Sequence, residues 1–230
     1  MPATDETMDE FAVAGSAMSA ECDIWFAMPP GFVEVPLPAS PPDPPDAAAT
    51  DGLEMLTELV PEEQYESLRS SMDEARAMGR LLARTGAVHL SMGVHHGESG
   101  EVLHSVFLIK WEEVPWAPPK LAAAKAALAS SEAREAELVD LPCGPAAVVE
   151  SLNEREGQQV FQLTGYLPHP DGRRVAVLAL STTAESGHAH YRDMFHGIAR
   201  MVSFDNPLPS QLREQVPEGR EVAAARDVFG

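Results

Sequence analysis

The segment from residue 146 to residue 204 constrains the fold of this chain most strongly. Its pattern predicts three strands followed by a helix. Residues 147–153 begin with an apolar run, residues 158–167 mix apolar and polar side chains in imperfect alternation, and residues 174–183 are nearly continuously apolar. The first two patterns predict strands without fixing their faces, and the third suits a central strand covered on both faces. The Asp-Gly pair at 171–172 predicts a tight hairpin turn between the last two strands.

The spacing of apolar residues changes after this third strand. Positions separated by three, four, seven and eleven residues fall on one face of a helix. Prolines at 207 and 209 prevent that helix from continuing far past residue 206. The simplest arrangement is a meander of antiparallel strands with the helix lying across one face. The apolar positions of this helix are Tyr191, Met194, Phe195, Ile198 and Val202.

Sequence patterns predict further strands and helices in the rest of the chain. Alternating apolar residues predict a hairpin, an alanine-rich stretch predicts a helix, and a proline followed by two glutamates predicts the start of another helix. We therefore expect an α+β fold with a single antiparallel sheet flanked by helices. The expected strands are 22–28, 32–35, 87–95, 101–112 and 135–141, and the expected helices are 61–85 and 120–130.

Composition divides the chain into three parts. Residues 1–21 are acidic and weakly apolar, which predicts a flexible N-terminal arm. Residues 22–204 are expected to form one α+β domain, and residues 205–230 a C-terminal tail without enough apolar residues for a domain of its own. Eight of the 20 prolines lie between Pro29 and Pro45, which makes residues 36–50 an expected extended loop.

Charge is concentrated at the front of the chain. The formal net charge is −20, and residues 1–68 hold 15 acidic residues and no Lys or Arg. Nucleic acids and anionic membrane surfaces are disfavoured as partners, because both bind through Lys and Arg. The acidic front serves solubility, or else it is an arm that meets a basic protein partner. No apolar run is long enough for a membrane span and no secretory signal is recognisable, so we expect a cytoplasmic protein.

The two cysteines, Cys22 and Cys143, are too few for a disulfide scaffold and lack the spacing of a zinc site. Two buried, reduced thiols are the favoured interpretation. A disulfide between them remains open for an oxidising compartment.

Three histidines are the only candidate metal ligands. If the turn at 97–100 pairs His96 with Glu101, then Gly93 faces His104, and His89, His95 and His104 share one face of the hairpin. Two imidazoles there would hold a divalent metal with a third ligand from elsewhere. Ordinary surface or half-buried histidines are favoured over this site, so no metal and no cofactor are predicted.

Motifs for other chemistry are missing from the sequence. There is no serine nucleophile elbow, no phosphate-binding glycine loop and no recognisable catalytic cysteine. Trp111 and Trp116 flank Val114-Pro115 and are candidates for a partner-binding groove, although core anchoring is the favoured role.

The order of expected elements resembles the Mog/PsbP-like fold, which includes actinobacterial proteins of the LpqN type. Residues 26–32 (Phe-Ala-Met-Pro-Pro-Gly-Phe) carry this resemblance near the start, and Tyr191, Phe195, Ile198 and the closing Val202-Ser203-Phe204 carry it at the end. Families of this fold are largely non-catalytic binding or accessory proteins, and the resemblance implies no site residues.

The leading hypothesis is a non-catalytic accessory or scaffold protein that binds another protein. The first alternative is a protein that binds a small apolar ligand between sheet and helix. The second is a metal-dependent hydrolase that uses His89, His95 and His104.

Overall fold

A computed structural model describes most of the chain between residues 11 and 205. The described residues are 11–18, 23–35, 37, 70, 79, 81–96, 101–130, 132–155, 157–184 and 186–205. Most of the expected helix at 61–85, most of the proline-rich loop at 36–50 and the tail beyond residue 205 lie outside them. Of that helix only residues 70, 79 and 81–85 are described, and 70, 79 and 81–83 are helical.

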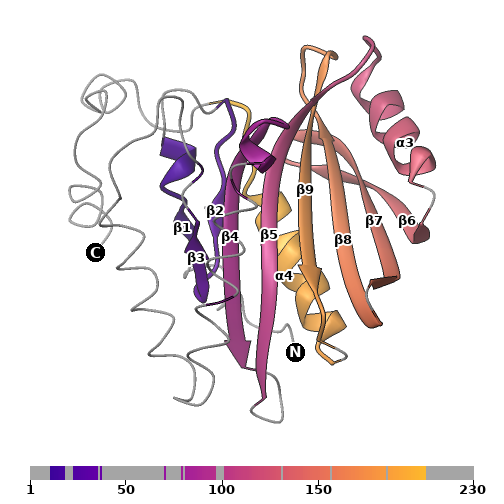
Figure 1. Cartoon of the computed structure of the whole chain (residues 1–230). Coiled ribbons are helices and arrows are strands. Elements are labelled where there is room, and N and C mark those ends of the chain that lie inside the picture. The colour runs from indigo at the N-terminus through magenta and orange to yellow at the C-terminus, as the bar shows by residue number, and fades with distance from the viewer. Residues whose placement is uncertain are drawn as a thin grey trace, which may run out of the picture.

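A seven-stranded antiparallel sheet dominates the described part of the molecule (Figure 1). Its strand order is β3-β4-β5-β9-β8-β7-β6, so most neighbours in space are also neighbours in sequence. The strands are β3 (Phe32–Glu34), β4 (Ala87–His96), β5 (Val102–Glu113), β6 (Ala133–Leu141), β7 (Gly144–Arg155), β8 (Gln158–Pro168) and β9 (Arg174–Thr182).

The expected α+β fold, with a single antiparallel sheet flanked by helices, is wrong. A second, two-stranded sheet pairs β1 (Ala12–Val13) with β2 (Ala27–Met28), and only three helices stand beside nine strands in the described residues. These helices are η1 (Ser16–Met18), α3 (Pro119–Ala129) and α4 (His188–Arg200). The structure is thus mainly β, because strands occupy most of residues 87–182 and the segment at 11–18, expected as an arm, supplies a strand and a helical turn.

The main core lies between the sheet and α4. Alternate residues of β5, β9, β8 and β7 point to this side, where Tyr191, Phe195 and Ile198 of α4 are fully buried. The helix therefore packs through the face that the sequence pattern predicted. The bridge between Trp25 and Ser203 joins the N-terminal segment to the chain after α4. The strand residues of this core include Leu103, Phe107, Ile109, Leu178, Leu180, Phe161, Leu163, Ala146 and Val148.

The opposite face of the sheet is covered at both ends. Leu90, Met92 and Val94 of β4 form a second buried cluster with Val33 and Val35. At the other end α3 contacts β6, β7 and β8. Its buried Ala122 and Ala123 allow the helix backbone to approach the sheet closely over Ala147 and Val149 of β7. Figure 1 shows α3 and α4 on opposite sides of the sheet.

An ion pair fastens α4 to the sheet. Arg192 donates from Nε and Nη2 to the two carboxylate oxygens of Glu150 on β7, over 2.6 and 2.9 Å. The Glu150 side chain is almost buried, and the bonds from Arg192 lower its pKa. The same guanidinium lies 5.5 Å from the ring centroid of Phe161, on which His188 stacks. The Arg192 guanidinium therefore keeps the almost buried Glu150 carboxylate in its charged form.

We predict that Arg192→Met destabilises the protein by about 2 kcal/mol, because it leaves the Glu150 carboxylate without its partner. Arg200→Met on the same helix is the matched control, since Arg200 is exposed, and a change under about 0.5 kcal/mol is expected there. Urea unfolding of both variants measures the difference. Equal stability of the two variants would show that the ion pair does not hold α4.

Candidate functional site

The three predicted metal ligands do not come together. Val94, not Gly93, faces His104, because the hairpin pairs His96 with Val102 rather than with Glu101. A shift of one residue moves every side chain of a strand to the other face. His89 and His95 lie on the α4 side, whereas His104 lies on the α3 side. No group of three metal-binding side chains occurs in the described residues.

His89 is the centre of a buried polar cluster. Its Nδ1 lies 2.7 Å from the hydroxyl oxygen of Ser16, and its Nε2 lies 3.1 Å from that of Ser91. A neutral imidazole donates from one nitrogen and accepts at the other, and both hydroxyls serve either role. The Phe26 ring packs edge-on against the imidazole with a centroid distance of 4.8 Å. Burial lowers the pKa of His89 to about 3, so the ring is neutral at physiological pH.

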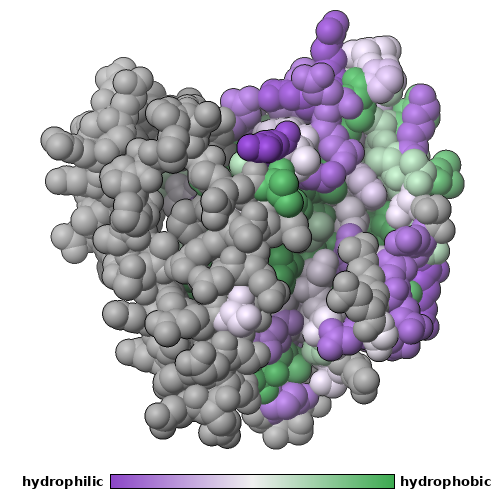
Figure 2. All heavy atoms as spheres, viewed as in Figure 1, coloured by the Kyte–Doolittle hydropathy of each residue, from purple (hydrophilic) through white to green (hydrophobic). Residues whose placement is uncertain are grey.

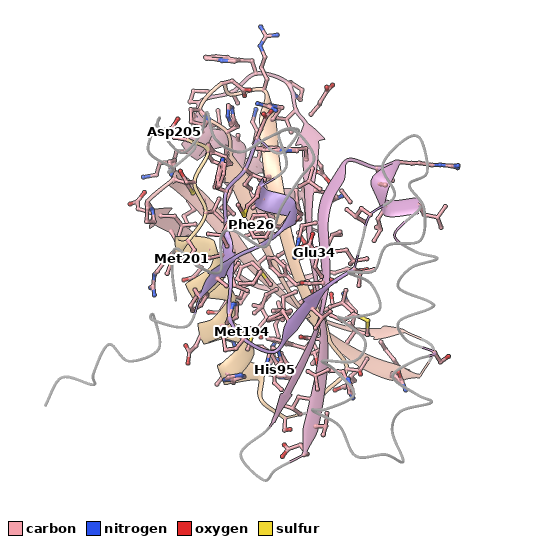
Figure 3. All side chains as sticks on the ribbon, turned by 90° about the vertical axis from the view of Figure 1, so that its left-hand side faces the viewer. Phe26, Glu34, His95, Met194, Met201 and Asp205 are labelled. Carbon is pink, nitrogen blue, oxygen red and sulfur yellow. The ribbon has the colours of Figure 1, made fainter. Side chains whose placement is uncertain are left out.

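Glu34 of β3 completes this cluster. Its carboxylate accepts the backbone N–H of Ser16 over 3.2 Å and lies 4.0 Å from Nδ1 of His89. Burial raises the pKa of Glu34, and the bonds from Ser16 and Gly15 oppose that effect. Figure 3 shows Glu34 and Phe26 on neighbouring segments of this edge of the sheet. The carboxylate thereby caps the first turn of η1.

The Ser16–His89 contact has the geometry of a nucleophile with its base, but its surroundings suit a structural role better. A general base works best when its pKa lies near the operating pH, and that of His89 is far below. The Glu34 carboxylate also accepts the backbone N–H of Ser16 itself, one of the donors that could stabilise a negatively charged intermediate. Local sequence spacing gave no signal for this cluster, because 73 residues separate Ser16 from His89.

We predict that acid destabilises the protein through His89. The unfolded chain binds a proton at this histidine near pH 6.5 and the folded chain only near pH 3, so stability is full above 6.5 and falls as the pH drops through that window. The loss is about 1.4 kcal/mol per pH unit below 6.5. Urea unfolding at several pH values between 5 and 7 measures this slope.

The control for this prediction is His89→Gln, which is expected to be less stable at neutral pH but to lack the slope. A slope of the same size in both proteins would show that other groups cause the acid sensitivity.

His95 and His104 occupy different surroundings. His95 lies against α4, where its ring contacts the rings of His190 and Tyr191 at centroid distances of 6.0 Å (Figure 3). Beneath it, a Cβ on Gly93 would come within 2.6 Å of Nε2 of His95 and 2.4 Å of Oγ of Ser105, so only glycine fits there. Burial lowers the pKa of His104 on the other face. His95 is therefore packed into the fold, whereas His104 is exposed on the opposite face of the sheet.

The two predicted partner-binding tryptophans have different surroundings. Trp111 of β5 packs against the main core and lies beneath Arg174, whose guanidinium is 4.8 Å from the indole centroid. Trp116 follows the end of β5 and is 67% exposed. It borders an open groove of about 560 Å³ at the β8–β9 hairpin. Charged residues dominate this groove, which is lined by Glu113, Val114, Pro115, Trp116, Asp171, Arg173 and Arg174.

Cys143 has a free thiol in the turn between β6 and β7. Burial raises its pKa to about 11, so the thiol stays protonated at neutral pH and is a poor nucleophile. Cys22 lies outside the described residues.

The outer strand β6 has the most unusual surface in the described part of the chain. It is nine residues long, pairs only with β7, and is exposed along most of its length. The opposite outer strand, β3, has only three residues. Long exposed edges are usually avoided in native proteins, because their unpaired backbone groups accept further strands.

The backbone groups of β6 that point outward are identified by its register with β7. Asp140 faces Pro145, and proline has no N–H for a hydrogen-bonded pair. Hydrogen-bonded and non-hydrogen-bonded pairs alternate along an antiparallel ladder. The N–H and C=O groups of Ala136, Leu138 and Asp140 therefore point away from β7. No strand among the described residues covers them.

Apolar side chains are exposed on β6 and on α3, the helix that contacts it. Leu138 of β6 is 53% exposed, and Leu121 and Leu128 of α3 are 47% and 86% exposed. The two α3 leucines are seven residues apart and share a helix face. Figure 2 shows apolar surface on the side of the molecule where α3 and β6 lie. Sequence reasoning missed this edge, because it depends on which strand ends the sheet.

On the α4 side the same edge is acidic. Glu135 and Glu137 face this side, since they lie opposite Glu150 and Val148 of β7. Oε1 of Glu137 lies 3.2 Å from Nε2 of His196 on α4, and about half of the Glu137 side chain is exposed. In its middle the edge thus presents Ala136 and Leu138 toward α3 but Glu135 and Glu137 toward α4. Nearer the turn to β7 this pattern ends, because Val139 lies on the α4 side and the exposed Asp140 on the α3 side.

No protein-family model matches the chain, and no curated protein matches its sequence significantly. The resemblance to the Mog/PsbP-like fold therefore stays a prediction. None of the described helices has the length and apolar content needed to cross a bilayer.

Proposed function

We propose that this protein is a non-catalytic accessory protein that binds another protein, and that the partner adds a strand to the outer edge of β6. The observation that carries this proposal is the row of outward backbone groups at Ala136, Leu138 and Asp140, which no described strand covers. A strand added there forms main-chain hydrogen bonds, which give affinity, while neighbouring side chains give specificity.

Two further features support this proposal. Leu138 lies on the edge strand itself and is half exposed, so a bound strand would cover it, and α3, which contacts β6, exposes Leu121 and Leu128. The hairpin turn to β7 and the ion pair between Glu150 and Arg192 hold the neighbouring strand in place, so the edge is rigid before binding. A preformed edge reduces the entropy that binding costs.

The metal-dependent hydrolase is not proposed, because the sheet separates His104 from His89 and His95. The groove beside Trp116 is open and lined largely by charged side chains, which does not favour a small apolar ligand there.

We predict that Ala136→Pro blocks partner binding while the fold survives. Proline removes the outward N–H of residue 136 but no hydrogen bond to β7, and proline is tolerated at such edge positions. The control is Ala136→Val, which keeps the N–H and suits a strand. The full chain carrying each substitution is used to capture proteins from a lysate, and captured proteins are then cross-linked to locate their contact.

The expected result is a protein that wild type and Ala136→Val capture and cross-link through β6, and that Ala136→Pro does not capture. Circular dichroism and urea unfolding check that Ala136→Pro is folded. Capture that is equally strong with the proline variant, or cross-links that avoid β6, would contradict the proposed binding mode.

A further inference from the structure

We infer that the strand bound by β6 alternates apolar side chains with Lys or Arg, which defines the chemical class of the partner segment. This inference rests on the proposed function. Successive side chains of a strand point to opposite faces of a sheet. A strand added to β6 therefore presents every second side chain to α3 and the others to α4.

The α3 side requires apolar side chains. There the added strand lies beside Ala136 and Leu138, on the side that also carries Leu121 and Leu128 of α3. These three leucines are each about half exposed or more. Cross-strand apolar pairs stabilise a sheet, whereas a charged side chain placed against these leucines would lose hydration without gaining a partner.

The α4 side requires basic side chains. Glu135 and Glu137 point there from β6, and the cation nearest to them on α4, Arg192, is already paired with the Glu150 carboxylate. His196 contacts Glu137 but is uncharged when deprotonated. Arg134 is the one cation of β6, and it lies at the irregularity between Ala133 and Glu135 near one end of the strand. Arg192 also attracts Glu135, so the half-exposed Glu137 is the carboxylate in the middle of the edge that a partner cation would meet.

The same charges disfavour a second copy of the chain in the registers centred on Glu137 or on Ala136. Two β6 strands paired antiparallel about Glu137 would place the two Glu137 side chains opposite each other. Pairing centred on Ala136 would place Glu135 opposite Glu137. Like charges directly opposite each other destabilise strand pairing, and each copy carries a net charge of −20.

Short labelled peptides test this inference with the full chain. The first alternates Lys and Val, the second alternates Glu and Val, and the third has the composition of the first with its lysines and valines in separate blocks. Fluorescence anisotropy gives their affinities at low and high salt. The alternating Lys/Val peptide is expected to bind about tenfold more tightly than the Glu/Val peptide at low salt, with the difference shrinking at high salt.

Variants of the protein localise the effect. Glu137→Gln is expected to weaken the Lys/Val peptide about threefold, whereas the exposed Glu113→Gln at the end of β5 leaves its affinity unchanged. Ala136→Pro is expected to abolish binding. A Lys/Val peptide with N-methyl groups on its β6-facing amides is expected to fail with the wild-type chain, which tests strand addition without altering the protein.

The outcomes separate the two proposals. If the Glu/Val or block peptide binds as tightly as the Lys/Val peptide, and Ala136→Pro abolishes that binding, the partner chemistry is wrong and the strand-accepting edge stands. If neither Ala136→Pro nor N-methylation affects any peptide, strand addition at β6 is wrong. If the chain forms a dimer and Ala136→Pro makes it monomeric, the occupant of the edge is a second copy of the chain rather than a basic partner.

Discussion

The hydrogen-bonding requirement of the polypeptide backbone determines what this fold leaves available. Each interior strand of the seven-stranded sheet satisfies its N–H and C=O groups on two neighbours, but an outer strand has only one. At the β3 end the exposure is limited, because that strand has three residues. At the β6 end the strand has nine residues, and the outward backbone groups of Ala136, Leu138 and Asp140 pair with no other strand in the described part of the chain. The proposed function follows from this asymmetry.

The rest of the structure packs the strands next to that edge on both faces. Both faces of the inner strands are buried, one against α4 and the other partly against α3 and the cluster around Leu90 and Met92. Polar groups inside this packing are paired with one another, as in the contacts of His89 with two serines and of Glu150 with Arg192. Such groups hold segments together that are far apart in the sequence. We therefore assign them to stability rather than to chemistry.

The sequence predicted individual strands and helices well where local patterns determine them. Alternation along residues 87–95, the Asp-Gly turn at 171–172 and the helical spacing from Tyr191 onward all correspond to elements of the structure. The predicted fold class failed in part because Ala12 and Val13, in a short segment of mostly small residues, pair with residues 27–28 to form a second sheet. Strand pairing between segments that are far apart in the sequence produces little pattern in the sequence of either segment.

The candidate sites were harder to predict for the same reason. The histidine site depended on a hairpin register, and one residue of difference placed His104 on the other face from His89. The edge at β6 depended on strand order, which no spacing in the sequence encodes. Trp116 is exposed and Trp111 is partly buried, although both lie near the same proline-containing turn. Their proposed part in partner binding stays a prediction.

Amide hydrogen exchange resolved by residue tests the openness of β6 most directly. In the free chain the amides of Ala136, Leu138 and Asp140 should exchange rapidly, while those of Glu137 and Val139, which bond to β7, should be protected. Addition of a bound strand should protect the first set and leave the second unchanged. Protection of all five amides in the free chain would show that the edge is already covered, and would contradict the account.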